Sequence, residues 1–210
     1  MENGIKRDIR LVGLDLDGTV FTDEKTITPA TKDAIARAVR AGVAVLPVTG
    51  RPRSGLPEEV LAIPGVRYAI TSNGAMCEDL AEDKVLVRLA MDEETAMRAL
   101  RIAEKYDVVI DIYIDGQAYT AADSMRLVQT HVPESFRPYF LKTRRLVEDR
   151  GRFLRQTGRG AEKFTILFQD MAQRAAAWQE FEQTGLFELS GGIPENIEVN
   201  AKGVDKGRAL

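Results

Sequence analysis

Ile9-Arg10-Leu11-Val12-Gly13-Leu14-Asp15-Leu16-Asp17-Gly18-Thr19 is the stretch that decides the fold. Its first part, residues 9–14, is a short apolar run that is typical of a buried strand. The strand leads directly into Asp15 and Asp17, and Gly18 then allows the chain to turn tightly. Two carboxylates this close repel each other, which costs free energy unless a cation balances their charge. The stretch therefore predicts a strand that carries an acidic, cation-binding loop at its end.

Two more strands are predicted to end in polar loops. Residues 43–48 form an apolar run that ends at Thr49-Gly50-Arg51, and residues 67–71 form another that ends at Ser72-Asn73-Gly74. Thr28 and Pro29 resemble an N-cap and the first position of a helix, and a helix is predicted to follow over residues 30–41, between the first two strands. This strand–helix alternation indicates a parallel sheet with crossover helices. Ligands of such sheets bind beyond the carboxyl ends of the strands, where all three loops fall.

The pattern changes after Gly74. Residues 75–79 and 84–89 resemble a hairpin, residues 92–106 a helix, and residues 108–114 alternate as a strand does. Such runs of hairpins and helices are typical of an α+β layer. We therefore predict an α/β protein with a Rossmann-like parallel-sheet core, residues 1–78 and 190–210. An inserted α+β domain occupies residues 79–189.

Composition narrows the chemistry. The 210-residue chain carries a formal net charge of −3, so no general attraction to nucleic acid or to an anionic membrane is expected. Its single cysteine, Cys77, excludes an internal disulfide and a metal site built on several thiolates, and fits a reducing cytoplasm. Its single histidine, His131, excludes sites that need several histidines. The chemistry must rest on carboxylates, lysine, arginine and hydroxyl groups.

Four segments together resemble a known family. Asp15-Leu16-Asp17-Gly18-Thr19 resembles motif one of the haloacid dehalogenase superfamily, and Val48-Thr49-Gly50-Arg51 resembles motif two of its Cof-type branch. Ser72-Asn73-Gly74-Ala75 resembles the entry into that branch's cap domain, and Gly203-Val204-Asp205-Lys206-Gly207 resembles motif three. The inserted domain matches a type-two, subclass B cap in position and size.

The resemblance implies a Mg²⁺-dependent phosphatase that acts on small phosphorylated metabolites, such as sugar phosphates, through an aspartyl-phosphate. Asp15 would be the nucleophile and a Mg²⁺ ligand. Asp17 would be the general acid and base, and would also bind Mg²⁺ through its backbone carbonyl. Thr49 would donate its hydroxyl to the phosphoryl group, and Lys206 would place a positive charge on it.

The resemblance also implies a set of substrate-binding residues, which are Thr49, Gly50, Arg51, Asn73 and Lys206. The residues alone leave simpler interpretations open. Thr49 could cap the segment after its strand, Arg51 could pair with a carboxylate, and Asn73 could brace its loop by hydrogen bonds. Lys202, four residues before Lys206, is a rival for the phosphate-binding role.

The chain departs from the family in one respect, because no segment resembles motif four, a Gly-Asp-x-x-Asn-Asp-like loop that supplies another Mg²⁺ ligand. In the family sheet the strand of motif one is central, and here it would become an edge. Three explanations stay open: a C-terminal part outside this sequence, a second copy that covers the edge in a homodimer, or an inactive relative. Two alternative functions stay open: a phosphomutase, because some relatives with this cap are phosphomutases, and a non-catalytic protein that binds phosphorylated ligands, which the missing motif supports.

Overall fold

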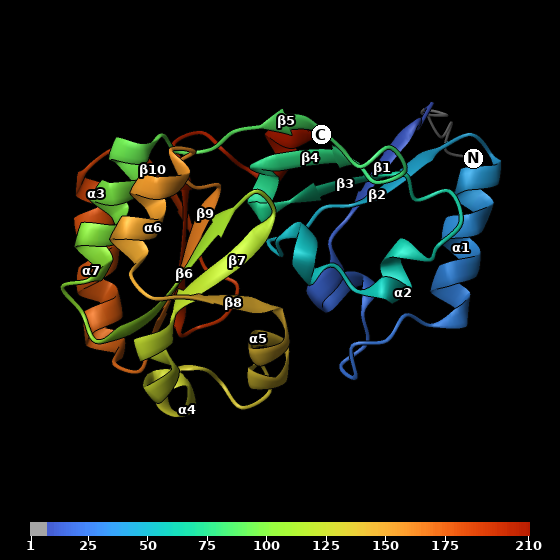
Figure 1. Ribbon diagram of the computed structural model, residues 1–210. Coiled ribbons are helices and arrows are strands. Elements are labelled where there is room, and N and C mark those ends of the chain that lie inside the picture. Colours follow the sequence, from blue (N-terminus) through green and yellow to red (C-terminus); the bar gives the residue numbers. More distant parts are fainter. Residues whose placement is uncertain (1–7) are drawn as a thin grey trace, which may run out of the picture.

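The computed structural model describes residues 8–210, so the first seven residues of the predicted core stretch lie outside it. The chain forms two lobes: the blue and teal N-terminal segments lie in one, together with the green residues 84–88 and the red C-terminal helix, and most of the green to orange segments lie in the other (Figure 1). No helix in the described part of the chain is long and apolar enough to cross a membrane.

The first lobe is built on a five-stranded arrangement. Its strands are β1 (Leu11–Leu14), β2 (Ala44–Pro47), β3 (Tyr68–Thr71), β4 (Met76–Asp79) and β5 (Lys84–Arg88). β1 and β2 pair in parallel, and the parallel bridge between Val48 and Ile70 extends this pairing to β3. β4 and β5 then follow as antiparallel neighbours. The predicted α/β class and parallel-sheet core are confirmed.

The helices of the first lobe are α1 (Pro29–Arg40) and the short α2 (Glu58–Leu61). α1 begins where the sequence predicts, because the Thr28 hydroxyl accepts a hydrogen bond from the backbone N–H of Thr31 at 3.1 Å. Its Ile35 is buried in one apolar cluster with Leu16 and Val45. The helix therefore anchors both the strand β2 and the turn that follows β1.

The second lobe contains a six-stranded sheet in the order β10-β11-β9-β6-β7-β8. Its strands are β6 (Val108–Ile114), β7 (Gln117–Ala121), β8 (Arg144–Val147), β9 (Lys163–Phe168), β10 (Phe187–Ser190) and β11 (Asn196–Ala201). Its helices are α3 (Glu93–Ala103), α4 (Val128–His131), α5 (Arg137–Thr143), α6 (Arg150–Thr157) and α7 (Met171–Gln183). The chain ends in α8 (Lys206–Ala209), which returns to the first lobe beside the Ser72–Gly74 turn.

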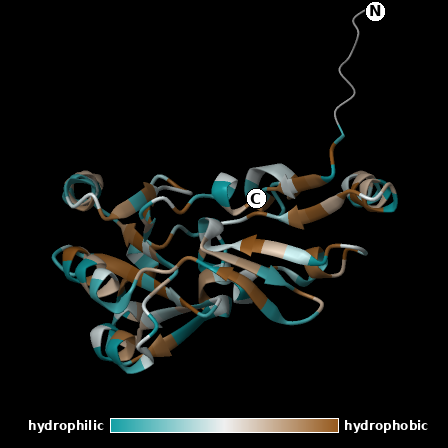
Figure 2. Ribbon diagram, turned by 90° about the horizontal axis from the view of Figure 1, so that it is seen from above, coloured by the Kyte–Doolittle hydropathy of each residue, from teal (hydrophilic) through white to brown (hydrophobic). Residues whose placement is uncertain are grey.

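The two faces of this sheet differ in polarity. Ile110, Ile166 and Val199 lie on one face and pack with α3, α6 and α7 in a single apolar cluster. The strands, coloured as hydrophobic, lie against these helices in Figure 2. Asp111 and Lys163 occupy alternate positions on the same strands, so they lie on the opposite face, and both are buried. Lys163 on that face contacts Gly50 of the first lobe, whereas Val109 and Leu167 on the same face pack against α4 and α5.

The domain limits at residues 79 and 189 stay a prediction. The pairing of the strands near these limits shows which sheet each of those strands belongs to. β5 follows residue 79 but pairs with β4 in the first lobe. β10 and β11 pair with each other and, through β11, with β9. Residues 196–200, which fall in the predicted core segment 190–210, therefore belong to a strand of the second-lobe sheet.

The strand β1 lies at the edge of its sheet. Among residues 8–210, its one strand neighbour is β2. Ile9 and Leu11 are 58% and 45% exposed. The position of β1 agrees with the expectation that the motif-one strand would be an edge in this chain.

The core of the second lobe offers a test of packing. Leu154 on α6 is fully buried, and Leu154→Ala should lower the free energy of unfolding by about 2–5 kcal/mol, because it removes buried methyl groups and leaves a cavity. Leu141 on α5 is 53% exposed, so Leu141→Ala should change stability by less than about 0.5 kcal/mol. Urea denaturation of both variants measures the difference, and equal losses would contradict this description of the core.

Candidate active site

The site forms where β1, β2 and β3 end. Backbone hydrogen bonds tie the three ends together: Val48 N–H donates to Leu14 O at 2.8 Å, and Thr49 N–H donates to Ile70 O at 2.9 Å. Asn73 N–H donates to Thr49 O at 3.1 Å. The acidic loop and the two polar loops therefore meet at one edge of the sheet, as the sequence predicts.

Asp15 meets a lysine from the far end of the chain. Lys206, the first residue of α8, places its Nζ atom 2.6 Å from Asp15 Oδ1. Lys202 instead pairs with Glu188 at 3.0 Å. Of the two rival lysines, the structure therefore brings Lys206 to the acidic loop, while its role in binding phosphate stays a prediction.

Asp17 is held by two cations. Arg51 contacts it in a bidentate manner, with Nε–Oδ2 and Nη2–Oδ1 distances of 2.9 Å, and Lys25 Nζ lies 3.0 Å from Oδ1. Partial burial opposes ionisation of this carboxyl, but the hydrogen bonds and charges of Arg51 and Lys25 outweigh it and hold the pKa of Asp17 below its ordinary value. Asp17 is therefore a carboxylate in this arrangement.

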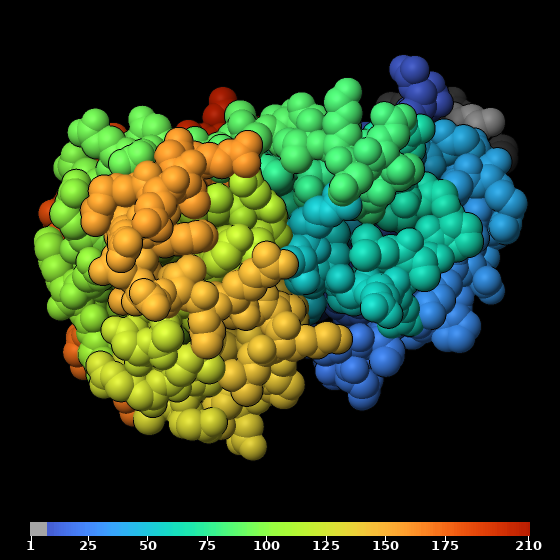
Figure 3. All heavy atoms as spheres, viewed as in Figure 1, coloured from blue at the N-terminus to red at the C-terminus, as the bar shows by residue number. Residues whose placement is uncertain are grey.

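Arg51 also connects the lobes. Its guanidinium lies 5.5 Å from the ring centre of Phe21 in the first lobe and 4.5 Å from that of Tyr139 on α5. The same group donates to the carbonyl of Gly55 at 3.3 Å. The space-filling view shows the two lobes in direct contact (Figure 3). Arg51 thus pairs with a carboxylate, as the simpler interpretation held, while its role in substrate binding stays untested.

Thr49 makes a local hydrogen bond that leaves its predicted catalytic role open. It is buried, and its hydroxyl oxygen accepts a hydrogen bond from the backbone N–H of Arg51 at 3.2 Å. Because a hydroxyl can accept and donate at once, its hydrogen is left to bond a phosphoryl oxygen. The local capping role therefore does not compete with the predicted catalytic role.

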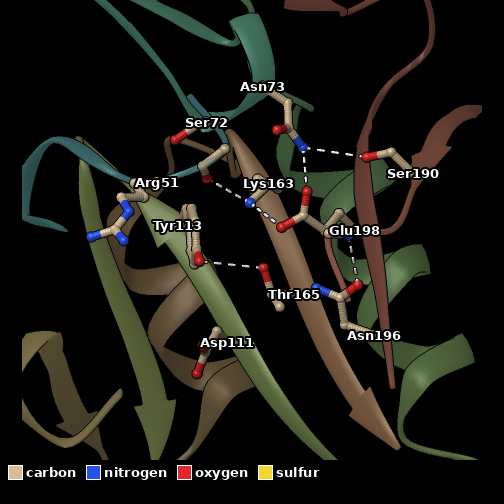
Figure 4. A network of polar contacts seen from close by, with 12 residues as sticks. Arg51, Ser72, Asn73, Asp111, Tyr113, Lys163, Thr165, Ser190, Asn196 and Glu198 are labelled. Atoms are coloured by element: carbon tan, nitrogen blue, oxygen red, sulfur yellow. Dashed lines mark hydrogen bonds and ion pairs between the residues drawn. The ribbon is translucent and has the colours of Figure 1, made fainter. Parts of the chain in front are cut away.

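Three polar residues of the second lobe that were not predicted from the sequence, Lys163, Glu198 and Asn200, lie against these loops. The Asn73 amide donates to Glu198 Oε2 at 2.7 Å and to Asn200 Oδ1 at 3.2 Å. Lys163 Nζ donates to Gly50 O and to Glu198 Oε1, both at 2.7 Å (Figure 4). Asn73 therefore does brace its loop. The signal for Lys163 and Glu198 was their alternation with apolar neighbours, which marks the polar face of a strand.

Glu198 is ionised at neutral pH although little of its side chain is exposed. Burial raises its pKa, but the charge of Lys163, the hydrogen bonds from Asn73 and Lys163, and the more distant charge of Lys206 bring the pKa below its ordinary value. A partly buried carboxylate with these partners is therefore part of the polar surface around the loops.

Motif three reaches Asp15 only because Gly74 lacks a side chain. Gly74 has φ +102°, and a Cβ atom there would lie 2.3 Å from the backbone oxygen of Asp205. Gly74→Ala should therefore destabilise the fold and displace Lys206. Gly185→Ala is the matched control, because Gly185 has φ +67° and nothing within 4 Å of such a Cβ. It should cost only about 1–2 kcal/mol in urea denaturation, and a similar loss at Gly74 would contradict the steric argument.

The low pKa of Asp17 predicts a pH effect on stability. A depressed folded-state pKa adds stability above the unfolded pKa of about 4, and this contribution is lost as the pH falls through the folded value. Asp17→Asn should therefore reduce the drop in melting temperature between about pH 5 and about pH 3. Asp33→Asn, on the exposed side of α1, is the control. If the melting temperature of Asp17→Asn falls as much as that of the wild type between about pH 5 and about pH 3, the ion pairs with Arg51 and Lys25 do not hold in solution.

Comparisons with known proteins place this site in a family. A model of haloacid dehalogenase-like hydrolases matches residues 12–210. The chain is 25% identical over 206 residues to pyridoxal phosphate phosphatase YbhA of Escherichia coli, covering 96% of this chain and 74% of that protein. It is 26% identical over 207 residues to 5-amino-6-(5-phospho-D-ribitylamino)uracil phosphatase YcsE of Bacillus subtilis, covering 97% and 70%.

Solved structures share the fold. A haloacid dehalogenase-like hydrolase from Bacillus subtilis superposes with a TM-score of 0.81 at 19% identity, covering 96% of this chain and 76% of that one. A subclass IIB sugar phosphatase superposes with a TM-score of 0.75 at 18% identity, covering 95% and 73%. The family match and the phosphatases among the relatives support a phosphoric monoester hydrolase. The chain belongs to the family of haloacid dehalogenase-like hydrolases.

Proposed function

We propose that this chain is a Mg²⁺-dependent phosphatase of small phosphorylated metabolites that works through an aspartyl-phosphate on Asp15. The observation that carries the proposal is the 2.6 Å contact between Asp15 and Lys206, at the sheet edge where the strand before Thr49 also ends. It combines a carboxylate nucleophile with a cation and a hydroxyl, the groups that a phosphoryl transfer needs. Relatives named for pyridoxal phosphate and for a phosphorylated ribitylaminouracil indicate the size of the substrate.

The acidic loop has the donors for Mg²⁺, although they do not complete its shell. Across residues 8–210, no three histidine, cysteine, aspartate or glutamate side chains are grouped as a metal site. Mg²⁺ often binds one or two carboxylates and fills its shell with waters and phosphate oxygens. Lys206 engages Oδ1 of Asp15, whose side chain is 39% exposed, so Oδ2 and the Asp17 carbonyl would hold the ion. When bound, Mg²⁺ supplies positive charge to the phosphoryl oxygens.

The proposed reaction has two steps. In the first, the carboxylate of Asp15 forms a bond to phosphorus as the bond to the leaving oxygen breaks, and the carboxylic acid form of Asp17 gives that oxygen a proton. In the second, the carboxylate of Asp17 accepts a proton from water, and the water oxygen attacks phosphorus, releasing phosphate and restoring Asp15. Thr49 and Lys206 hold the phosphoryl group in both steps.

The test is phosphate release from a panel of phosphorylated metabolites with Mg²⁺ and with excess chelator. Asp15→Asn should lower the rate by more than about a thousandfold, because the nucleophile is lost. Lys206→Met should lower it by about a hundredfold, whereas Lys202→Met should leave it at the wild-type level. Full activity in Asp15→Asn, or transfer of the phosphoryl group to a second sugar hydroxyl without release, would reject the hydrolytic mechanism.

A further inference from the structure

The polar face of the second-lobe sheet contacts the backbone of the motif-two loop through one buried ammonium group. Lys163 is 1% exposed, and its Nζ atom lies 2.7 Å from Gly50 O and 2.7 Å from Glu198 Oε1. The ring centre of Tyr113 lies 4.6 Å away on the same face. Lys163 makes its contacts with both lobes at the same time (Figure 4), so it connects the second lobe to the loop that carries Thr49.

A second connection runs through a strained turn. Ser72 and Asn73 have φ values of +51° and +62°, a region that costs energy for residues other than glycine. The second lobe holds this turn, because Glu198 accepts from the Asn73 amide at 2.7 Å and Asn200 donates to Ser72 O at 2.9 Å. This turn also holds the motif-two loop. Ser72 N–H donates to Arg51 O at 2.9 Å, and Asn73 N–H donates to Thr49 O at 3.1 Å.

We infer that Lys163 and Glu198 are positioning residues that fix the phosphate-binding loop Thr49-Gly50-Arg51 from the second lobe. Lys163 acts on this loop directly through Gly50 O, and Glu198 acts on it through Lys163 and through the Asn73 turn. The inference rests on the proposed function of that loop. It assigns the second lobe a part in forming the phosphate site, in addition to enclosing a substrate.

The packing around Gly50 shows that this contact has little freedom. A Cβ atom on Gly50 would lie 2.6 Å from Asn73 Oδ1, 3.4 Å from Glu198 Oε2 and 3.5 Å from Lys163 Nζ. The loop backbone therefore lies directly against all three side chains. A buried ion pair is not in itself a reason for stability, because removing both charges from water is costly. The contact of Lys163 with the carbonyl of Gly50 explains the ion pair better, because this contact fixes the geometry of the loop.

The test uses the full chain and a double variant, Lys163→Met with Glu198→Gln. The double variant leaves no unpaired buried charge and so avoids the misfolding expected of Lys163→Met alone. Lys163→Arg keeps the charge and serves as the conservative variant. Lys105→Met is the matched control, because Lys105 pairs with Glu180 between α3 and α7, away from the loop. Amide hydrogen exchange of peptides covering residues 48–52, the KM and kcat for a phosphorylated substrate, and inhibition by inorganic phosphate are measured for each.

We expect the rate of amide exchange in residues 48–52 to rise about tenfold or more in the double variant, while the strands of the second lobe keep their protection from exchange. Inhibition by phosphate should weaken, and kcat/KM should fall about tenfold to a hundredfold, as for a loop displaced by about 1 Å. In Lys163→Arg, the exchange in residues 48–52 and the kcat/KM should lie between those of the double variant and those of the wild type. Lys105→Met should match the wild type.

Two results would overturn the inference: wild-type exchange in residues 48–52 of the double variant, or a uniform rise over the whole second lobe, which marks a merely structural pair. The hydrogen-exchange measurement does not depend on turnover. If the wild-type protein releases no phosphate from any substrate, the proposed function fails, and the exchange measurement still decides whether Lys163 and Glu198 hold the loop.

Discussion

The structure depends on the charge balance of its acidic loop. Asp15 and Asp17 lie one residue apart at the end of β1, and three cations from separate parts of the chain meet them. Lys206 is 191 residues from Asp15 in sequence, so this balance joins chain segments that lie before and after the second lobe. The second lobe is therefore inserted between two residues that form one ion pair.

The sequence predicted well wherever a local pattern determines the outcome. Short apolar runs that end in polar residues identified β1, β2 and β3, and parallel strands must bring the residues after their carboxyl ends to one edge. Thr28 and Pro29 located the start of α1 for a similarly local reason. The choice of Lys206 over Lys202 came from the family pattern, and the geometry agrees with it.

The parts that the sequence did not predict depend on contacts between distant strands. The alternation in β9 and β11 shows that Lys163 and Glu198 share a side of their strands with other polar residues, but not which strands pair. The pairing of Glu198 with Thr165 and of Asn200 with Lys163 across the β11–β9 ladder forms this face. The same applies to Tyr139, whose position against Arg51 follows from how α5 sits between the lobes. The local pattern therefore identifies the polar side of a strand but not the residues that it contacts.

Arg51 creates a tension that the proposed chemistry must resolve. A general acid needs a proton, whereas the bidentate contact with Arg51 favours the carboxylate form of Asp17. The arrangement suits the second step, in which Asp17 accepts a proton, and opposes the first. In the proposed reaction, a phosphoryl group held by Thr49 would present anionic oxygens that compete with Asp17 for the guanidinium. Because Arg51 also stacks on Tyr139, its release from Asp17 would alter a contact between the lobes, so the proposed chemistry would link the protonation of Asp17 to that contact.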